Sequence, residues 1–258
     1  MKYIRKAIAL VLIAVFIAAV AIGLSVIFAV RNVNVFTVDY ATESDCDGTD
    51  EFSEAVASVK AGLSDFEGKT ITSVRDDDIA AVVNASGYAE FVSAERVYPC
   101  TINVTVRERV EVFAVPADDG SYYTMLDGNC SAISTKQSNA NNIDGSPNVV
   151  LFGVPAEDYT LVTSLCNTMA QKYLSVRAFA ESISVTSDAM LGESLLIKLR
   201  CGVTMEIREY KERAEEKAER LFSAFDSMAD YLKLGGTMYC MDTESGALRV
   251  VLPDGTVE

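Results

Sequence analysis

The chain has 258 residues, half of them hydrophobic, and its 37 acidic residues outnumber its 22 lysines and arginines to give a formal net charge of −15. Such an acidic surface repels nucleic acid phosphates and anionic headgroups, so we expect neither as a ligand. The sequence contains no histidine, which removes the commonest general base and the most frequent zinc ligand. We therefore predict no catalytic residues, no metal site and no cofactor.

The N-terminal segment from Ala7 to Val30 carries no charge and follows three basic residues. A bilayer core about 30 Å thick is crossed by about 20 apolar residues in a helix, and basic residues favour the cytoplasmic side. The apolar part of a cleaved signal peptide is shorter, about 7–15 residues. These features predict a cytoplasmic tail at 1–6, a single transmembrane helix at 7–30 and location of the remaining chain outside the cytoplasmic membrane.

Residues 32–115 have the pattern of a small α+β domain. Alternating apolar residues predict a strand at 33–38, and an apolar face repeated every three to four residues predicts a helix from Asp50 to Phe66. A second helix follows with three aspartates in its first turn. Their negative charges are stabilised by the positive N-terminal end of the helix dipole. Two further strands are expected at 91–97 and 102–115, giving the order β-α-α-β-β.

The segment from Pro116 to Gly120 interrupts the pattern and predicts a domain boundary. Residues 116–258 then predict a second, mixed α/β domain with an antiparallel-rich sheet. We expect one helix around 159–173, a long helix at 209–234 and a final hairpin of strands at 237–241 and 247–252. The whole chain is thus predicted to be α+β with an N-terminal transmembrane helix.

An acidic segment and the cysteines each leave two interpretations open. The segment from Asp45 to Glu51 has the acidic spacing of a crude calcium loop, but it lacks the twelve-residue ligand series of an EF-hand, so a solvated turn is favoured. The six cysteines form no C-x-x-C pair. They are expected to be mostly free, although an even number outside the cytoplasm also permits disulfides.

The segment from Glu95 to Ala114, ERVYPCTINVTVRERVEVFA, and the segment from Tyr123 to Gly128, YTMLDG, carry a family resemblance. Together with the order of the predicted elements, they resemble the FtsQ/DivIB family of bacterial cell division proteins. In that family a POTRA domain precedes a C-terminal β domain. The resemblance implies a POTRA-like domain at 32–115 and an FtsQ/DivIB-like β domain at 116–258.

The resemblance also implies a function: a non-enzymatic, membrane-anchored scaffold of the division septum. Its expected partners are small membrane-embedded coiled-coil proteins of the FtsB/DivIC and FtsL types, with no small-molecule substrate. The alternative is a membrane-anchored cell-wall enzyme or ligand sensor.

The last predicted strand, Ala247 to Leu252, is apolar and has no later strand to cover it, so we expect a sheet edge that could accept a partner strand. In the family the C-terminal strands bind the FtsB/DivIC partner. The resemblance therefore implies five partner-binding residues, which are Tyr239, Met241, Leu248, Val250 and Leu252. The alternative is an internal strand whose apolar residues are ordinary core.

Overall fold

The computed structural model describes residues 2–38, 49–173, 175–188, 192–240, 248–252 and 255, with the side chains of 2–10, 231, 232 and 248 left undescribed. The chain divides into two compact units, Met1–Arg109 and Val110–Glu258, each considered by itself below. About 37% of the chain is helix and about 35% is strand. The α+β part of the predicted fold class is therefore confirmed.

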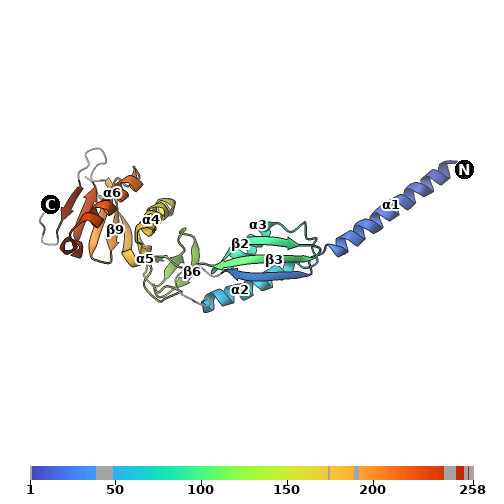
Figure 1. The fold of residues 1–258 in the computed structure, drawn as a ribbon, viewed down its shortest axis with the longest axis horizontal. Helices are drawn as coiled ribbons and strands as arrows, with labels where there is room; N and C mark the ends of the chain where they lie inside the picture. The colour runs from blue at the N-terminus through green and yellow to red at the C-terminus, as the bar shows by residue number, and fades with distance from the viewer. Residues whose placement is uncertain are drawn as a thin grey trace. The chain divides into compact units, whose positions relative to one another are not determined.

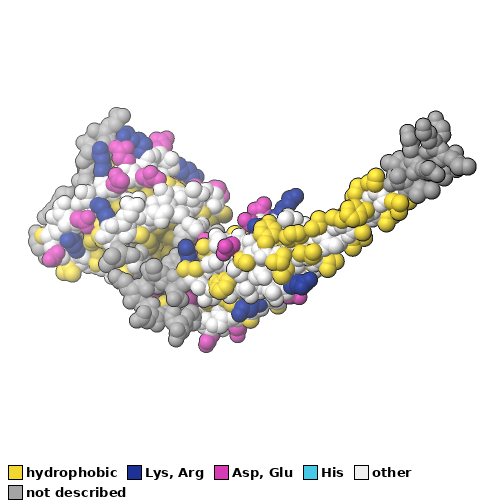
Figure 2. Space-filling view, turned by 45° about the vertical axis from the view of Figure 1, so that its right-hand side comes forward, with side chains coloured by type: hydrophobic (Ala, Val, Ile, Leu, Met, Phe, Trp, Pro, Cys, Tyr) yellow, Lys and Arg dark blue, Asp and Glu magenta, His cyan; other side chains and the backbone are white. Residues whose placement is uncertain are grey.

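Helix α1, Lys2–Ile27, opens the chain, and hydrophobic side chains cover the visible face of its described part (Figure 2). Among the described residues, however, no helix is both long and apolar enough to cross a membrane. The predicted transmembrane helix at 7–30 and the predicted single-pass membrane location are thus contradicted.

The first unit contains a three-stranded sheet in the order β1-β3-β2, in which β1 runs parallel and β2 antiparallel to the central β3 (Figure 1). Two helices lie between β1 and β2 in the sequence, so the observed order of elements is the expected β-α-α-β-β. The elements are β1 Asn32–Val38, α2 Asp50–Leu63, the short 3-10 helix η1 Ser64–Phe66, α3 Asp76–Asn84, β2 Ala89–Val97 and β3 Thr101–Glu108.

The core of the first unit lies between its sheet and its helices. Alternate residues of β3 point into it, so that Ile102, Val104 and Val106 are at most 1% exposed. They belong to one hydrophobic cluster with buried residues of α2 and α3, among them Val59 and Ile79. The strand pattern read from the sequence is confirmed here, because one face of β3 is buried throughout and the other is not.

The predicted strand at 102–115 is wrong, because it is two strands in different units. Strand β3 ends at Glu108 and β4 begins at Phe113. Between them the backbone changes partners: the Arg109 N–H donates to the Tyr88 carbonyl, and the Glu111 N–H donates to the Asn142 side chain. The Val112 N–H then donates to the Leu126 carbonyl, which belongs to the second unit. The division between the two units falls in this stretch, after Arg109.

The second unit is built on a nine-stranded sheet in the order β12-β11-β10-β9-β8-β7-β4-β5-β6. Five strand pairs are antiparallel and three, β4–β7, β7–β8 and β10–β11, are parallel. The strands are β4 Phe113–Pro116, β5 Tyr123–Leu126, β6 Ala132–Lys136, β7 Val149–Phe152, β8 Ala180–Asp188, β9 Gly192–Leu199, β10 Val203–Arg208, β11 Gly236–Cys240 and β12 Leu248–Val251.

Helices α4 and α6 pack together and share one hydrophobic core with the sheet. Their buried faces include Leu165 and Met169 of α4 and Leu221 and Phe222 of α6. The helical elements of this unit are η2 Ala156–Asp158, α4 Tyr159–Tyr173, α5 Val176–Phe179, α6 Ala214–Ser227 and η3 Asp230–Leu234.

The long helix predicted at 209–234 is shorter in the structure. Glu209 and Arg213 both have positive φ, 47° and 52°, a left-handed conformation that a right-handed helix does not contain. The α-helix therefore begins only at Ala214 and ends at Ser227. The buried Lys217 stabilises this turn, since its ammonium group donates to the carbonyls of Arg208 (2.8 Å) and Glu209 (3.1 Å).

Candidate functional site

Strand β12 lies at one end of the nine-stranded sheet, and β11 is its only neighbour among the described strands. The two strands are antiparallel and share four residue pairs: Thr237↔Val251, Met238↔Val250, Tyr239↔Arg249 and Cys240↔Leu248. In an antiparallel strand, backbone groups point alternately to the two sides. On its outer side, β12 therefore presents N–H and C=O groups that no described strand pairs with.

A glycine sets the closest approach between the last two strands. Gly236 has a φ of +100°, and a Cβ atom at this position would lie 2.3 Å from the carbonyl oxygen of Val251 and 3.2 Å from the Cα of Leu252. Real Cβ atoms do not approach backbone atoms to 2.3 Å. The position of β12 thus depends on the absence of a side chain at residue 236.

The two faces of this sheet end differ in chemistry. Met238 and Cys240 are buried, and Val250 packs against the same hydrophobic core. On the opposite face, the guanidinium carbon of Arg208 lies 4.4 Å from the ring centroid of Tyr239, a cation–π distance. Arg249, the cross-strand partner of Tyr239, is exposed beside it.

The five residues implied as partner-binding therefore fall on different faces. Tyr239 belongs to the face opposite the core, whereas Val250 faces the core. Leu248 occupies the first position of β12, opposite Cys240, and Leu252 follows the strand and is partly buried. Met241 lies outside the described residues.

Three residues that sequence reasoning missed also shape this edge: Arg208, Gly236 and Arg249. The register of the three strands is what brings them together, and the sequence pattern does not fix that register. A Gly-Gly pair at 235–236 just before an apolar strand was the one available signal, since glycine is favoured where backbones approach closely.

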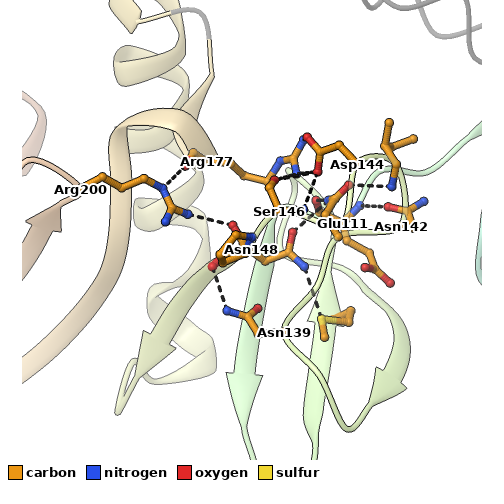
Figure 3. Close-up of polar contacts among 12 residues, drawn as sticks. Glu111, Asn139, Asn142, Asp144, Ser146, Asn148, Arg177 and Arg200 are labelled. Atoms are coloured by element: carbon orange, nitrogen blue, oxygen red, sulfur yellow. Dashed lines mark hydrogen bonds and ion pairs between the residues drawn. The ribbon is translucent and has the colours of Figure 1, made fainter.

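The other end of the same sheet, at β6, is built differently (Figure 3). Glu111 is fully buried, and its carboxylate lies 3.0 Å from the ammonium group of Lys136, a residue of β6. Ser134 of the same strand donates a hydrogen bond to that carboxylate at 3.2 Å. An edge strand with an inward-pointing charge is poorly suited to accept another strand.

The asparagine-rich loop after β6 is hydrogen-bonded to the backbone of Glu111. Asn141 donates to the backbone carbonyl of Glu111 and to the side chain of Asn148, while Asn142 accepts from the Glu111 N–H at 3.1 Å. These bonds join two segments about 30 residues apart in sequence. The backbone N–H and C=O of Glu111 are thus both satisfied by amide side chains.

Two arginines hold this loop from the α5 side (Figure 3). Arg177 donates to Asp144 and Ser146, both at 3.0 Å, and Arg200 donates to the Pro147 carbonyl at 2.8 Å. The Ser146 hydroxyl, which donates to the Asp144 carboxylate, and the nearby Arg177 lower the pKa of Asp144 to about 2. The β6 end of the sheet is therefore fixed by side chains and charge, unlike β12.

The described residues offer little for metal or thiol chemistry. Within the parts of the chain that the structure covers, no group of three or more Cys, Asp or Glu side chains could hold a metal ion. The aspartates 76–78 occupy the first turn of α3, where the helix dipole accounts for them. Most of the proposed calcium loop, 45–48, lies outside the described residues.

Five of the six cysteines are described, and no disulfide joins any two of these five. Three of them, Cys130, Cys166 and Cys240, are buried. Burial raises the pKa of the Cys130 and Cys166 thiols, so both are held in the neutral, unreactive form. The lack of a disulfide among these five described cysteines agrees with the expectation from the sequence.

A buried tyrosine–carboxylate pair is the remaining polar feature of the core. The Tyr210 hydroxyl donates to Asp158, and the tyrosine is fully buried. Burial, with a smaller contribution from that hydrogen bond, raises the pKa of Tyr210 to about 12. The pair ties the turn after β10 to the start of α4 and is satisfied internally.

Comparison with known proteins adds no family: no protein-family model matches the chain, and no curated protein matches its sequence.

Proposed function

We propose that this protein is a non-enzymatic scaffold of the bacterial division machinery. In this proposal it binds small coiled-coil division proteins of the FtsB/DivIC and FtsL types during septum formation. The observation that carries the proposal is the position of β12 at the end of a nine-stranded sheet, with only β11 beside it among the described strands. The resemblance of residues 95–114 and 123–128 to the FtsQ/DivIB family supplies the class of partner.

The proposed binding mode is addition of a partner strand to the outer side of β12. Main-chain hydrogen bonds between the strands would supply affinity, and side chains pointing alternately to the two faces would supply selectivity. On one face the partner strand would lie beside Arg249, the cross-strand neighbour of Tyr239, and on the other it would extend the apolar surface beside Val250. An acidic residue on the partner would complement Arg249.

The contrast between the two sheet ends supports this choice of edge. At β6 the inward-turned Lys136 and the tethered loop are features that protect an edge. At β12 the described residues 249–252 contain one charge, Arg249, and no proline. The two ends of one sheet thus give an internal comparison, with β12 the better acceptor.

Affinity purification of the tagged full-length chain from its own cells tests the proposal. The expected result is recovery of small coiled-coil proteins of the FtsB/DivIC type. Val250→Pro should abolish their recovery, because proline lacks an N–H and disrupts an extended strand. Thr135→Pro in β6 is the matched control, since it places the same residue in the strand at the other end of the sheet and should leave recovery unchanged.

Two outcomes would contradict the proposal. One is undiminished recovery of the partner by a folded chain truncated after Gly246, which lacks β12 altogether. The other is purification of the chain with a bound cell-wall fragment, or turnover of such a fragment, in place of a partner protein. That second result would favour an enzyme or ligand sensor.

A further inference from the structure

The C-terminal end of α1 is joined to the first unit by backbone hydrogen bonds on two sides. The Val30 N–H donates to the Lys69 carbonyl and the Ile71 N–H to the Phe28 carbonyl, both at 2.8 Å. On the other side, the Arg31 N–H donates to the Cys100 carbonyl at 2.8 Å. These bonds fix the last turn of α1 beside the loop at 68–72 and the turn at 98–100.

An apolar pocket of about 370 Å³ lies at this junction. Its α1 side consists of Ala21, Leu24, Ser25 and Phe28, whose spacing places them on one face of the helix. Across from them Tyr98, 58% exposed, makes an edge-to-face contact with Phe28 at a centroid distance of 6.1 Å. Thr70 and Thr72 complete the lining, so the pocket has a mainly apolar surface with a few hydroxyl groups.

A second, charged pocket of about 460 Å³ adjoins the first, since Thr72 and Tyr98 line both. Its charged lining consists of two arginines and two aspartates: Arg75, Arg96, Asp76 and Asp77. Arg96 is held in place by Asp76 and by the Val74 carbonyl, each at 2.7 Å. Arg75 is exposed beside them.

We propose that the two pockets form one groove that binds a single zwitterionic phospholipid of the phosphatidylethanolamine type. An acyl chain would occupy the apolar pocket, where burial of hydrocarbon is worth about 25 cal/mol per Å². In the charged pocket, Arg75 would face the phosphate and Asp77 would face the ammonium group.

Charge complementarity favours this headgroup over the alternatives. Arg96 and Asp76 pair with each other, so Arg75 and Asp77 leave one charge of each sign for a headgroup that carries one of each. A chain with a net charge of −15 disfavours an anionic lipid at long range. A choline headgroup has a positive charge but no N–H, so it cannot donate a hydrogen bond to Asp77.

Calorimetric titration of the purified full-length chain with dihexanoyl phosphatidylethanolamine, below its micelle concentration, tests the inference. We expect saturable binding of one molecule per chain, and binding at least tenfold weaker with the phosphatidylglycerol and phosphatidylcholine of the same chain length. Ala21→Trp, which fills the apolar pocket, should weaken binding at least tenfold. Ala19→Trp adds the same side chain about 200° away around the helix and should leave binding unchanged.

Arg75→Glu should weaken ethanolamine-lipid binding at least tenfold, because it removes a positive charge from the headgroup pocket. Absence of saturable binding, or equal binding by the Ala21→Trp and Ala19→Trp variants, would overturn the inference. Equal binding of the glycerol and ethanolamine lipids would overturn the zwitterionic assignment. None of these outcomes depends on partner binding at β12.

Discussion

Gly236→Ala should release β12 from the sheet while the rest of the second unit stays folded. The added methyl group would lie 2.3 Å from the Val251 carbonyl oxygen, and the neighbouring atoms are backbone, which cannot rotate away as a flexible side chain could. Alanine also disfavours the φ of +100° at this position. Strand β12 must therefore move or β11 must change its backbone conformation.

The energies involved are similar in size. A non-glycine residue in a sparsely populated backbone region costs about 1–3 kcal/mol, and the close contact adds to this cost. Four residue pairs hold β12 to β11, and hydrogen bonds contribute about 0.5–1.5 kcal/mol each. The cost of the substitution thus approaches what the β11–β12 pairing contributes, so detachment of this one strand is the expected response.

Amide hydrogen exchange followed by mass spectrometry measures this directly. Peptides covering β12 should lose most of their protection in Gly236→Ala, while peptides of β8 and β9 keep theirs, and partner recovery should fall with β12 protection. Gly120→Ala is the control, because Gly120 also has positive φ (+68°) but has no atom within 4 Å of the added carbon. Native protection of β12 in Gly236→Ala would refute the reasoning.

Three further predictions concern stability. Val104→Asp buries an unpaired carboxylate at a position with no exposed surface, so thermal unfolding should show a loss of about 3 kcal/mol or more; an unchanged melting temperature would show that the residue faces solvent. Lys136→Met should cost about 3 kcal/mol by removing a cation from the buried Glu111, and adding Glu111→Gln should restore most of it in chemical denaturation. The pKa of Asp144 is lowered to about 2 from its ordinary 3.8, so the ionised carboxylate stabilises the fold above pH 4. This stabilisation is lost as the pH falls from about 4 to about 2. Because this carboxylate is half exposed, Asp144→Asn should remove at most about 1 kcal/mol above pH 4, and less as the pH falls toward 2; an equal loss at pH 2 would contradict this.

The sequence predicted elements best where one face is buried along their whole length. The alternation through Ile102, Val104 and Val106 located β3 because every second residue faces the helices. The same alternation continues through residues 109–112, where the Arg109 N–H bonds to Tyr88, the Glu111 N–H to the Asn142 side chain and the Val112 N–H to Leu126 of β5. Those long-range bonds carry no local signal, so one strand was predicted where the structure has two in separate units.

The helix at 209–234 was overextended for a related reason. Its apolar residues do repeat at helical spacing, but Glu209 and Arg213 take a left-handed conformation. Two buried residues hold that turn. Lys217 donates to the carbonyls of Arg208 and Glu209, and Tyr210 donates to Asp158. Periodicity reports which residues are buried, and it does not report where tertiary contacts force the helix to begin.

The sequence predicted that the candidate site is a strand at a sheet edge. It did not predict which side chains lie on each face of that edge. Apolar residues near the end of the sequence indicated the last hairpin, and the structure has β12 at the end of the sheet. The distribution of Tyr239 and Val250 onto opposite faces depends on strand register. The stacking of Arg208 on Tyr239 and the close approach at Gly236 depend on it as well.

The most direct test of a β12 docking edge is amide hydrogen exchange of the chain with and without the proposed FtsB/DivIC-type partner. In the complex, the amides of 248–252 should become protected, because their outer N–H groups would bond to the partner strand, while those of β6 should exchange as before. Unchanged exchange at 248–252, with new protection elsewhere on the chain, would contradict docking at β12.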